Sequence, residues 1–403
     1  MNSANIELSI QSAPTPQDTT TPDADWNSQH QFDLGDSTEF ALPPVDRGKD
    51  AWGFLAAAFT IECLVWGFPF AYGIFQTTTV RTSHSQDLET LPSLAHNVTH
   101  LIVTQGVFYA IGGGLVYSPV IQFMDEWFVR RKGLAFGVMW AGTGIGGVLI
   151  PLLLEYLLNN HGFRTTLRIW SIILFLLTAP LLYFLKPRLP IPQSQSSFTR
   201  RFDLSFLKDR TFLILQAGNV LEGLGYFVPS IYLPTIATRL GASSSVSSLT
   251  VILLNIASVF GCVAMGSIID RWHVTTCILV STIGSTGSIF LVWGLSTSLP
   301  PLFVFCVMYG LFAGSFSSTY PGIRMAVQES VGRADVSMVL ALLSAGRGIG
   351  NVICGPASEG LARLGVWRAA GTYGTEYGPL VLFTGISAAL GGVGVLGRRV
   401  GWM

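Results

Sequence analysis

Residues 127–147, WFVRRKGLAFGVMWAGTGIGG, join a cluster of basic residues to a segment of small and apolar residues. The basic cluster, Arg130, Arg131 and Lys132, is typical of a loop at a membrane surface, where it contacts anionic lipid headgroups. Small side chains on a helix let its neighbours approach closely inside a bilayer. Here they are expected to form one such helix face, which consists of Gly137, Ala141, Gly142, Gly144, Gly146 and Gly147. The stretch therefore predicts a membrane-spanning helix that begins next to a basic loop.

The composition of the whole chain also indicates a membrane protein. Hydrophobic residues make up 50% of it, and the 44 Gly among 403 residues add about 11%, whereas apolar residues and Gly together reach about 45–50% in soluble domains. Charged residues make up 11% of the chain, which is too few to cover a water-facing surface of this size. The formal net charge of zero predicts no nucleic-acid partner, because such a partner needs a basic face.

No sequence pattern points to an enzyme. The five Cys lie in apolar segments without a CxxC pair, and the six His lie outside those segments, so no metal site is predicted. The chain contains neither a nucleotide-binding GxxxxGK[ST] loop nor a Ser/His/Asp set at one membrane depth. We therefore expect no catalytic residue, no cofactor and no metal.

Apolar runs of about 20 residues are long enough to cross the hydrocarbon core as helices. The sequence holds ten of them: 51–75, 101–123, 134–158, 166–185, 211–235, 246–269, 275–296, 300–323, 337–362 and 378–397. The polar connection 186–210 divides them into an N-terminal bundle of four spans (47–185) and a C-terminal bundle of six (211–403). Residues 1–46 are rich in Ser, Thr, Pro, Gln and Asp and predict a disordered tail.

The distribution of Lys and Arg predicts the orientation of these spans. If the N-terminus is cytoplasmic, 16 of the 23 basic residues lie in inner segments, so both termini and the connection 186–210 are predicted to be cytoplasmic. Asn97, in the sequon Asn97-Val98-Thr99, then faces outward and is a candidate glycosylation site.

Three segments carry a more specific signal: 43–53 (PPVDRGKDAWG), 127–137 (WFVRRKGLAFG) and 266–271 (GSIIDR). Together they resemble the signatures of the monocarboxylate porter family of the major facilitator superfamily, particularly its fungal branch. The resemblance implies an all-α fold of two helical bundles in the plasma membrane. It also implies secondary-active transport of a small organic acid or a secondary metabolite, with export as the direction that fungal members suggest.

This chain departs from that family in two ways. The family has twelve helices, but the basic signature here follows the second span instead of the fourth, so helices two and three of the family are predicted to be missing. A skipped exon, a mis-drawn gene model or a true ten-helix protein would each explain the gap, and a non-transporting sensor or a defective remnant is the alternative function. Moreover, Phe70 follows Phe68-Pro69 where animal members have Lys, so their lactate-binding residues cannot be carried over.

Three ionisable residues lie midway along predicted spans: Glu62, Glu222 and Arg347. An ionisable group near the bilayer centre costs about 2.5–3.5 kcal/mol, which favours a functional role. Arg347 would bind an anionic group, because its guanidinium matches a carboxylate in bidentate fashion. Glu62 or Glu222 would take up a proton. The alternative is that Arg347 and a glutamate neutralise each other as a structural pair.

Uncharged polar residues in the same or neighbouring spans complete the predicted substrate site. They are Tyr226, Asn219, Gln105, Asn255 and Asn351. Pro229 permits a bend in the span 211–235, next to this site. The expected partners are a small-molecule substrate, protons and the lipid bilayer.

Overall fold

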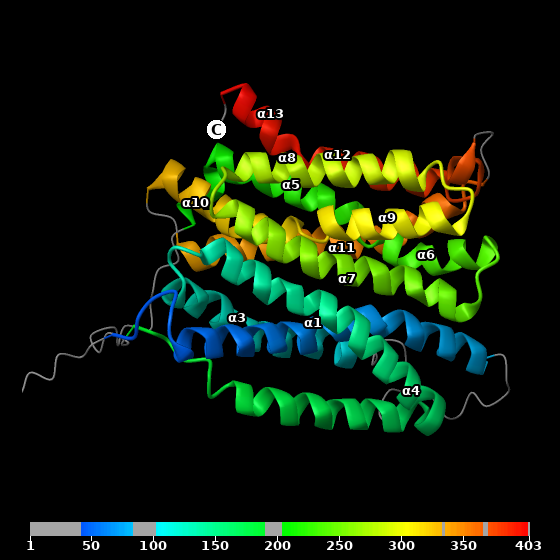
Figure 1. Ribbon diagram of the computed structural model, residues 1–403, viewed down its shortest axis with the longest axis horizontal. Helices are drawn as coiled ribbons and strands as arrows, with labels where there is room; N and C mark the ends of the chain where they lie inside the picture. The colour runs from blue at the N-terminus through cyan, green and yellow to red at the C-terminus, as the bar shows by residue number, and fades with distance from the viewer. Residues whose placement is uncertain (1–41, 84–101, 190–203, 333–334, 366–369, 402–403) are drawn as a thin grey trace, which may run out of the picture. The chain divides into compact units, whose positions relative to one another are not determined.

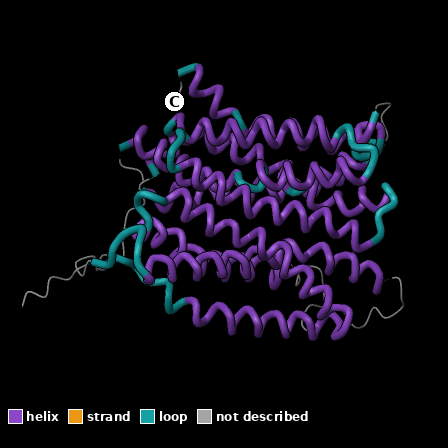
Figure 2. The backbone as a smooth tube through the Cα atoms, viewed as in Figure 1, coloured by secondary structure: helices purple, strands orange, loops and turns teal. Residues whose placement is uncertain are grey.

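Apolar helices run alongside one another in the part of the chain that the structure describes (Figure 1, Figure 2). The structure is a computed structural model, and it describes residues 42–83, 102–189, 204–332, 335–365 and 370–401. All of these belong to one unit, Leu42–Met403. No strand occurs among the described residues. The predicted all-α membrane fold is thereby confirmed, whereas the orientation of the termini and the bundle boundaries stay predictions.

Few, long helices form the N-terminal part: α1 (Lys49–Ser83), the π-helical turn η2 (Ile102–Val107), α3 (Phe108–Trp127) and α4 (Lys132–Leu181). The C-terminal part has more and shorter elements. They are η3 (Ser205–Lys208), α5 (Arg210–Tyr226), α6 (Val228–Arg239), α7 (Ser244–Ile269), α8 (Val274–Gly287), η4 (Ser288–Trp293), α9 (Leu299–Phe312), η5 (Phe316–Thr319), α10 (Tyr320–Val331), α11 (Val336–Ala362), η6 (Gly371–Gly374), α12 (Gly378–Gly391) and α13 (Val393–Arg399).

Within the described residues, eight helical segments are long and apolar enough to cross a membrane, and each coincides with a predicted span. The other two predicted spans also form helices: 101–123 lies in η2 and α3, and 166–185 begins in the shorter apolar helix Thr165–Leu181. Gly162 separates that helix from the preceding one, because its φ of 72° and ψ of 171° are not helical. The span 211–235 bends as predicted, since α5 ends at Tyr226 and α6 starts at Val228, just before Pro229.

The glycines of α4 bring two neighbouring helices into backbone contact. A Cβ atom on Gly137 would lie 2.5 Å from the carbonyl oxygen of Cys262 in α7. On the other face of α4, a Cβ on Gly142 would lie 2.3 Å from the carbonyl oxygen of Phe59 in α1. Side chains at these positions would collide with backbone, so close helix packing requires glycine here. The small residues predicted to serve one face therefore serve two.

The first turn of α4 and the loop before it are held by two aspartates from other parts of the chain. Asp46 accepts backbone N–H groups of residues 129–131 at 3.0–3.2 Å. Residues 42–46, which the sequence assigns to the tail, therefore contact the helices, whereas 1–41 lie outside the described residues. Asp270, at the end of α7, accepts the N–H groups of Gly133 at 2.6 Å and Leu134 at 2.9 Å. Partial burial raises the pKa of the Asp270 carboxyl, although both backbone bonds act to lower it.

Candidate functional site

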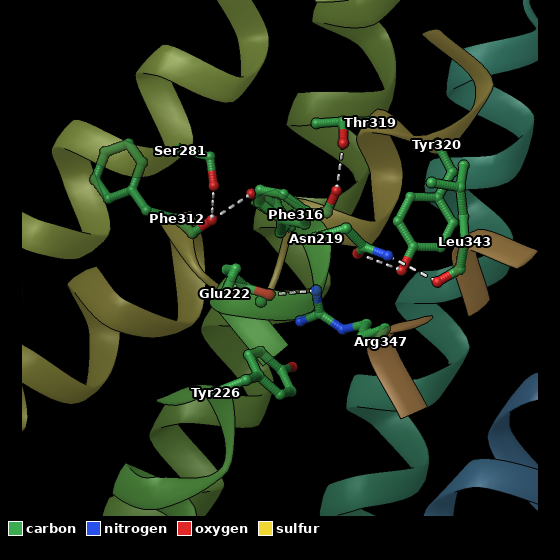
Figure 3. Close-up of polar contacts among 12 residues, drawn as sticks. Asn219, Glu222, Tyr226, Ser281, Phe312, Phe316, Thr319, Tyr320, Leu343 and Arg347 are labelled. Atoms are coloured by element: carbon green, nitrogen blue, oxygen red, sulfur yellow. Dashed lines mark hydrogen bonds and ion pairs between the residues drawn. The ribbon is translucent and has the colours of Figure 1, made fainter. Parts of the chain in front are cut away.

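A buried ion pair joins the C-terminal helices α5 and α11. Figure 3 shows the Arg347 guanidinium of α11 directed at the Glu222 carboxylate of α5, and the two side chains form a hydrogen-bonded salt bridge. Their side chains are 10% and 6% exposed. A charge of this kind is retained inside a protein when an opposite charge compensates it. Of the alternatives left open by the sequence, the structure therefore contains the neutralising pair, with Glu222 as the partner of Arg347.

Aromatic rings cover the Arg347 side of this pair. The guanidinium carbon lies 4.4 Å from the ring centre of Tyr226 and 5.5 Å from that of Phe316. Both distances are within the range of a cation–π interaction, which grows stronger away from water. Tyr226 follows Glu222 by one turn of α5, as the sequence predicts, whereas Phe316 comes from η5 and nothing in the sequence marks it out.

Two amides extend the polar group along α5 and α11. The Asn219 side chain donates to the Leu343 carbonyl oxygen at 2.7 Å and accepts the Tyr320 hydroxyl at 2.9 Å (Figure 3). Asn351 follows Arg347 by one turn of α11, and its buried Oδ1 atom has no hydrogen-bond partner among the described residues. Five predicted residues thus gather where α5 meets α11: Asn219, Glu222, Tyr226, Arg347 and Asn351.

Glu62 of α1 occupies a separate environment. Its side chain is almost fully buried, with the residue 2% exposed, and its Oε1 accepts the Thr143 hydroxyl of α4 at 3.2 Å. The buried Oε2 atom has no hydrogen-bond partner within the described ranges, and no Lys or Arg there forms an ion pair with Glu62. Thr143 was not predicted, although it is the one hydroxyl residue in the glycine-rich segment 133–147 and that isolation could have marked it.

A bridge of aromatic side chains connects the surroundings of Glu62 with those of Arg347. The Trp140 indole N–H donates to the Tyr117 hydroxyl at 2.9 Å, and Tyr117 lies within electrostatic range of Glu62. The Trp140 ring also meets the ring of Tyr320 edge-on at 5.5 Å, and Tyr320 bonds Asn219 as described. Side-chain contacts therefore run from Tyr117 of α3 through Trp140 of α4 and Tyr320 of α10 to Asn219, three residues before Glu222 in α5.

The remaining predicted residues lie elsewhere or outside the description. The Asn255 amide of α7 donates to the Val251 carbonyl oxygen at 3.1 Å and to that of Gly147 in α4 at 3.4 Å, which places it in the packing of α4 against α7. Gln105 lies in η2, but its side chain is outside the described part of the structure. Asn97 falls in the segment 84–101, which is also outside it. No group of three or more His, Cys, Asp or Glu in the described ranges could hold a metal ion.

Comparison with known families matches residues 88–319 and, in a second overlapping match, 215–399 to the Major Facilitator Superfamily. Among the relatives, the MFS transporter asaE of Aspergillus flavus is 28% identical over 233 residues, 58% of this chain and 52% of that protein. The fujikurins efflux protein of Gibberella fujikuroi is 28% identical over 243 residues, 59% of this chain and 51% of that protein. Human monocarboxylate transporter 10 is 26% identical over 291 residues, 67% of this chain and 55% of that protein.

A solved structure shares the fold. The crystal structure of the E. coli fucose:proton symporter matches 87% of this chain and 84% of its own with a TM-score of 0.56 and 12% identity. The chain spans about half the length of the relatives it matches. None of these matches tests whether helices of the family are missing, so the absence of helices two and three stays a prediction.

Proposed function

The chain belongs to the Major Facilitator Superfamily, and on that premise we propose that it is a secondary-active transporter that exports an acidic metabolite across the plasma membrane. The family match and the relatives, which include an efflux protein and a monocarboxylate transporter, support transport of a small organic molecule. The chemistry of the buried site supports an anion as its cargo.

The buried pair of Arg347 and Glu222 is the observation that carries this proposal. Arg347 holds a permanent positive charge, and its fork of donors matches a carboxylate or a phosphate. Glu222 occupies that fork in the structure. An anionic substrate would displace Glu222 from Arg347, and a proton taken up by Glu222 would cancel the charge that is released. The site then stays neutral before and after binding, which couples one proton to one anionic charge.

Glu62 is the second group that would carry a proton. An ionised carboxylate without a counter-ion is expensive to bury, so the protonated form is favoured in such a place. A neutral carboxyl could also donate from its unpartnered oxygen to a substrate group. Asn219, Tyr226 and Asn351 would then supply uncharged contacts from α5 and α11, and Gln105 stays a predicted substrate contact, whereas Asn255 is engaged in the packing of α4 against α7.

The test is complementation of a deletion strain. Untargeted mass spectrometry of cells and medium should reveal an acidic metabolite that accumulates in deletion cells and returns to the medium with the wild-type chain. The variant Arg347→Lys keeps the charge but loses the bidentate geometry, so we expect export to fall about tenfold or more, the equivalent of about 1.4 kcal/mol.

A matched control lies at the end of the same helix. Arg363 also pairs with a glutamate, Glu359, but both side chains are largely exposed. Arg363→Lys should therefore export at the wild-type rate, with immunoblots confirming equal protein levels. If Arg347→Lys exports at the wild-type rate, Arg347 does not bind the substrate in bidentate fashion and the proposed site is wrong. If deletion changes no solute at all, the chain is a non-transporting membrane protein, the alternative that the predicted absence of two helices leaves open.

A further inference from the structure

A cavity lies apart from the group around Arg347, where the segment before α1 meets the start of α4 and the end of α7. Its volume is about 730 Å³. Four arginines line it: Arg47 before α1, Arg130 and Arg131 before α4, and Arg271 after α7. Asp46 and Asp270 are the acidic residues of the lining. The sequence analysis assigned the basic residues of this region to a loop at the membrane surface and gave them no ligand.

The two aspartates are already engaged by backbone groups. Asp46 accepts three N–H groups of the loop before α4, and Asp270 accepts two from the first turn of that helix. These bonds shape the wall of the cavity, and of the about four acceptor sites of a carboxylate they occupy three on Asp46 and two on Asp270. Asp270 also lies within electrostatic range of Arg271, so its charge is shared between the helix and that side chain.

The four arginines, in contrast, have guanidinium N–H groups that are not engaged by a carboxylate of the described residues. All four residues are exposed. Four positive charges face two negative ones around the same space, which leaves the lining with an excess of positive charge. Arginine forks bind phosphate oxygens in bidentate fashion, and several of them on one cavity form a phosphate-binding surface.

The position of the cavity relative to the helices indicates where such a phosphate would come from. Each of the three membrane-crossing segments beside it ends within a few residues of the lining: they are Lys49–Phe70, Lys132–Phe163 and Ser245–Ile269. The cavity therefore lies at the depth of lipid headgroups, on the side predicted to be cytoplasmic. Basic pockets between transmembrane helices on that side are suited to phosphate-bearing headgroups.

We propose that this cavity is a binding site for a phosphate monoester that joins the two halves of the chain at their predicted cytoplasmic ends. Arg130 and Arg131 belong to the N-terminal half, and Arg271 belongs to the C-terminal half. A phosphate held by all three reinforces the contact that Asp270 makes with α4. A ligand that binds the state with α4 and α7 in contact stabilises that state over one in which they separate. The phosphate is carried by an anionic lipid or by a soluble metabolite.

The test uses the purified full-length chain in dodecyl maltoside and native mass spectrometry. The probes are dioctanoyl phosphatidic acid, its headgroup glycerol 3-phosphate, and dioctanoyl phosphatidylcholine as a lipid without net charge. We expect one molecule of a phosphate monoester to bind, and the variant Arg130→Gln/Arg131→Gln/Arg271→Gln to weaken that binding at least tenfold. Binding of phosphatidic acid alone identifies a membrane lipid as the source. Equal binding of glycerol 3-phosphate identifies a soluble one.

Two further variants keep the result interpretable if the glutamine variant folds poorly. The triple lysine variant at the same positions keeps the charge but loses the bidentate geometry, so it should bind more weakly than the wild type and more tightly than the glutamine variant. Three exposed arginines predicted to lie on the other side of the membrane provide the control, as Arg168→Gln/Arg239→Gln/Arg363→Gln, which should bind normally. Phosphatidic acid that binds no more tightly than phosphatidylcholine, or equally to the wild type and a folded glutamine variant, overturns the proposal.

Discussion

Glu62 and Glu222 are the same residue type, each midway along a predicted span, but the two halves of the chain surround them differently. Glu222 meets a guanidinium group, and two aromatic rings cover that group. Glu62 meets one hydroxyl, and its second oxygen has no hydrogen-bond partner among the described residues. In the C-terminal half, a charge is compensated by an opposite charge. In the N-terminal half, we expect compensation by a proton, so the same glutamate-to-glutamine change should be costly at Glu222 and nearly neutral at Glu62.

The largest expected effect comes from breaking the compensated side. Glu222→Gln leaves the Arg347 charge buried without a counter-ion, and removing one partner of a buried pair typically costs about 3–5 kcal/mol. We expect the free energy of unfolding to fall by that amount. Equilibrium unfolding of the purified chain in mixed micelles of dodecyl maltoside and dodecyl sulfate measures it.

A double variant and an exposed pair serve as controls for this prediction. Adding Arg347→Met to Glu222→Gln removes the orphaned charge, so the double variant should recover much of the lost free energy. Glu359→Gln breaks the exposed pair with Arg363 on the same helix, where such a pair contributes only about 0.3–0.5 kcal/mol. If Glu222→Gln lowers the free energy of unfolding no more than Glu359→Gln does, the buried pair contributes no more to stability than the exposed pair.

An intermediate effect is expected from the ring that covers Arg347. Tyr226→Leu keeps an apolar side chain but loses the π-system that lies 4.4 Å from the guanidinium carbon. A cation–π interaction contributes about 0.5–1 kcal/mol at an exposed site and about 2 kcal/mol when it is desolvated, so we expect the free energy of unfolding to fall by about 2 kcal/mol. Tyr226→Phe keeps the ring and serves as the control. A loss in Tyr226→Phe as large as in Tyr226→Leu would assign the effect to the hydroxyl and not to the ring.

The fold follows closely from the sequence because each span is a local property. Twenty apolar residues in a row have no other stable place than a bilayer, and the predicted runs match helices. The break at Gly162 and the bend before Pro229 are also local, since they depend on one residue's backbone freedom or missing N–H group. The second small-residue face of α4 was not predicted, because a list of glycines does not say how many helices pack against them.

The site was harder to predict, since its contacts join residues far apart in the chain. Glu222 and Arg347 lie 125 positions apart, and the sequence offered Glu62 and Glu222 as equal partners for the arginine. Only the packing of α5 against α11 selects one of them. Asn255 illustrates a second difficulty. A buried amide can be satisfied by the carbonyl oxygen four residues earlier in its own helix, so a polar residue in a span need not face a substrate.

The smallest effect on stability is expected at Glu62, and it tests the comparison most directly. Glu62→Gln has nearly the same shape as a protonated glutamate, and its amide oxygen can still accept the Thr143 hydroxyl. If the wild-type carboxyl is neutral, the free energy of unfolding should change by no more than about 1 kcal/mol, the scale of one neutral hydrogen bond. The same micelle titration gives this value beside that of Glu222→Gln. A loss near 3–5 kcal/mol would instead mean that Glu62 is ionised and paired, so that the two halves compensate their charges in the same way.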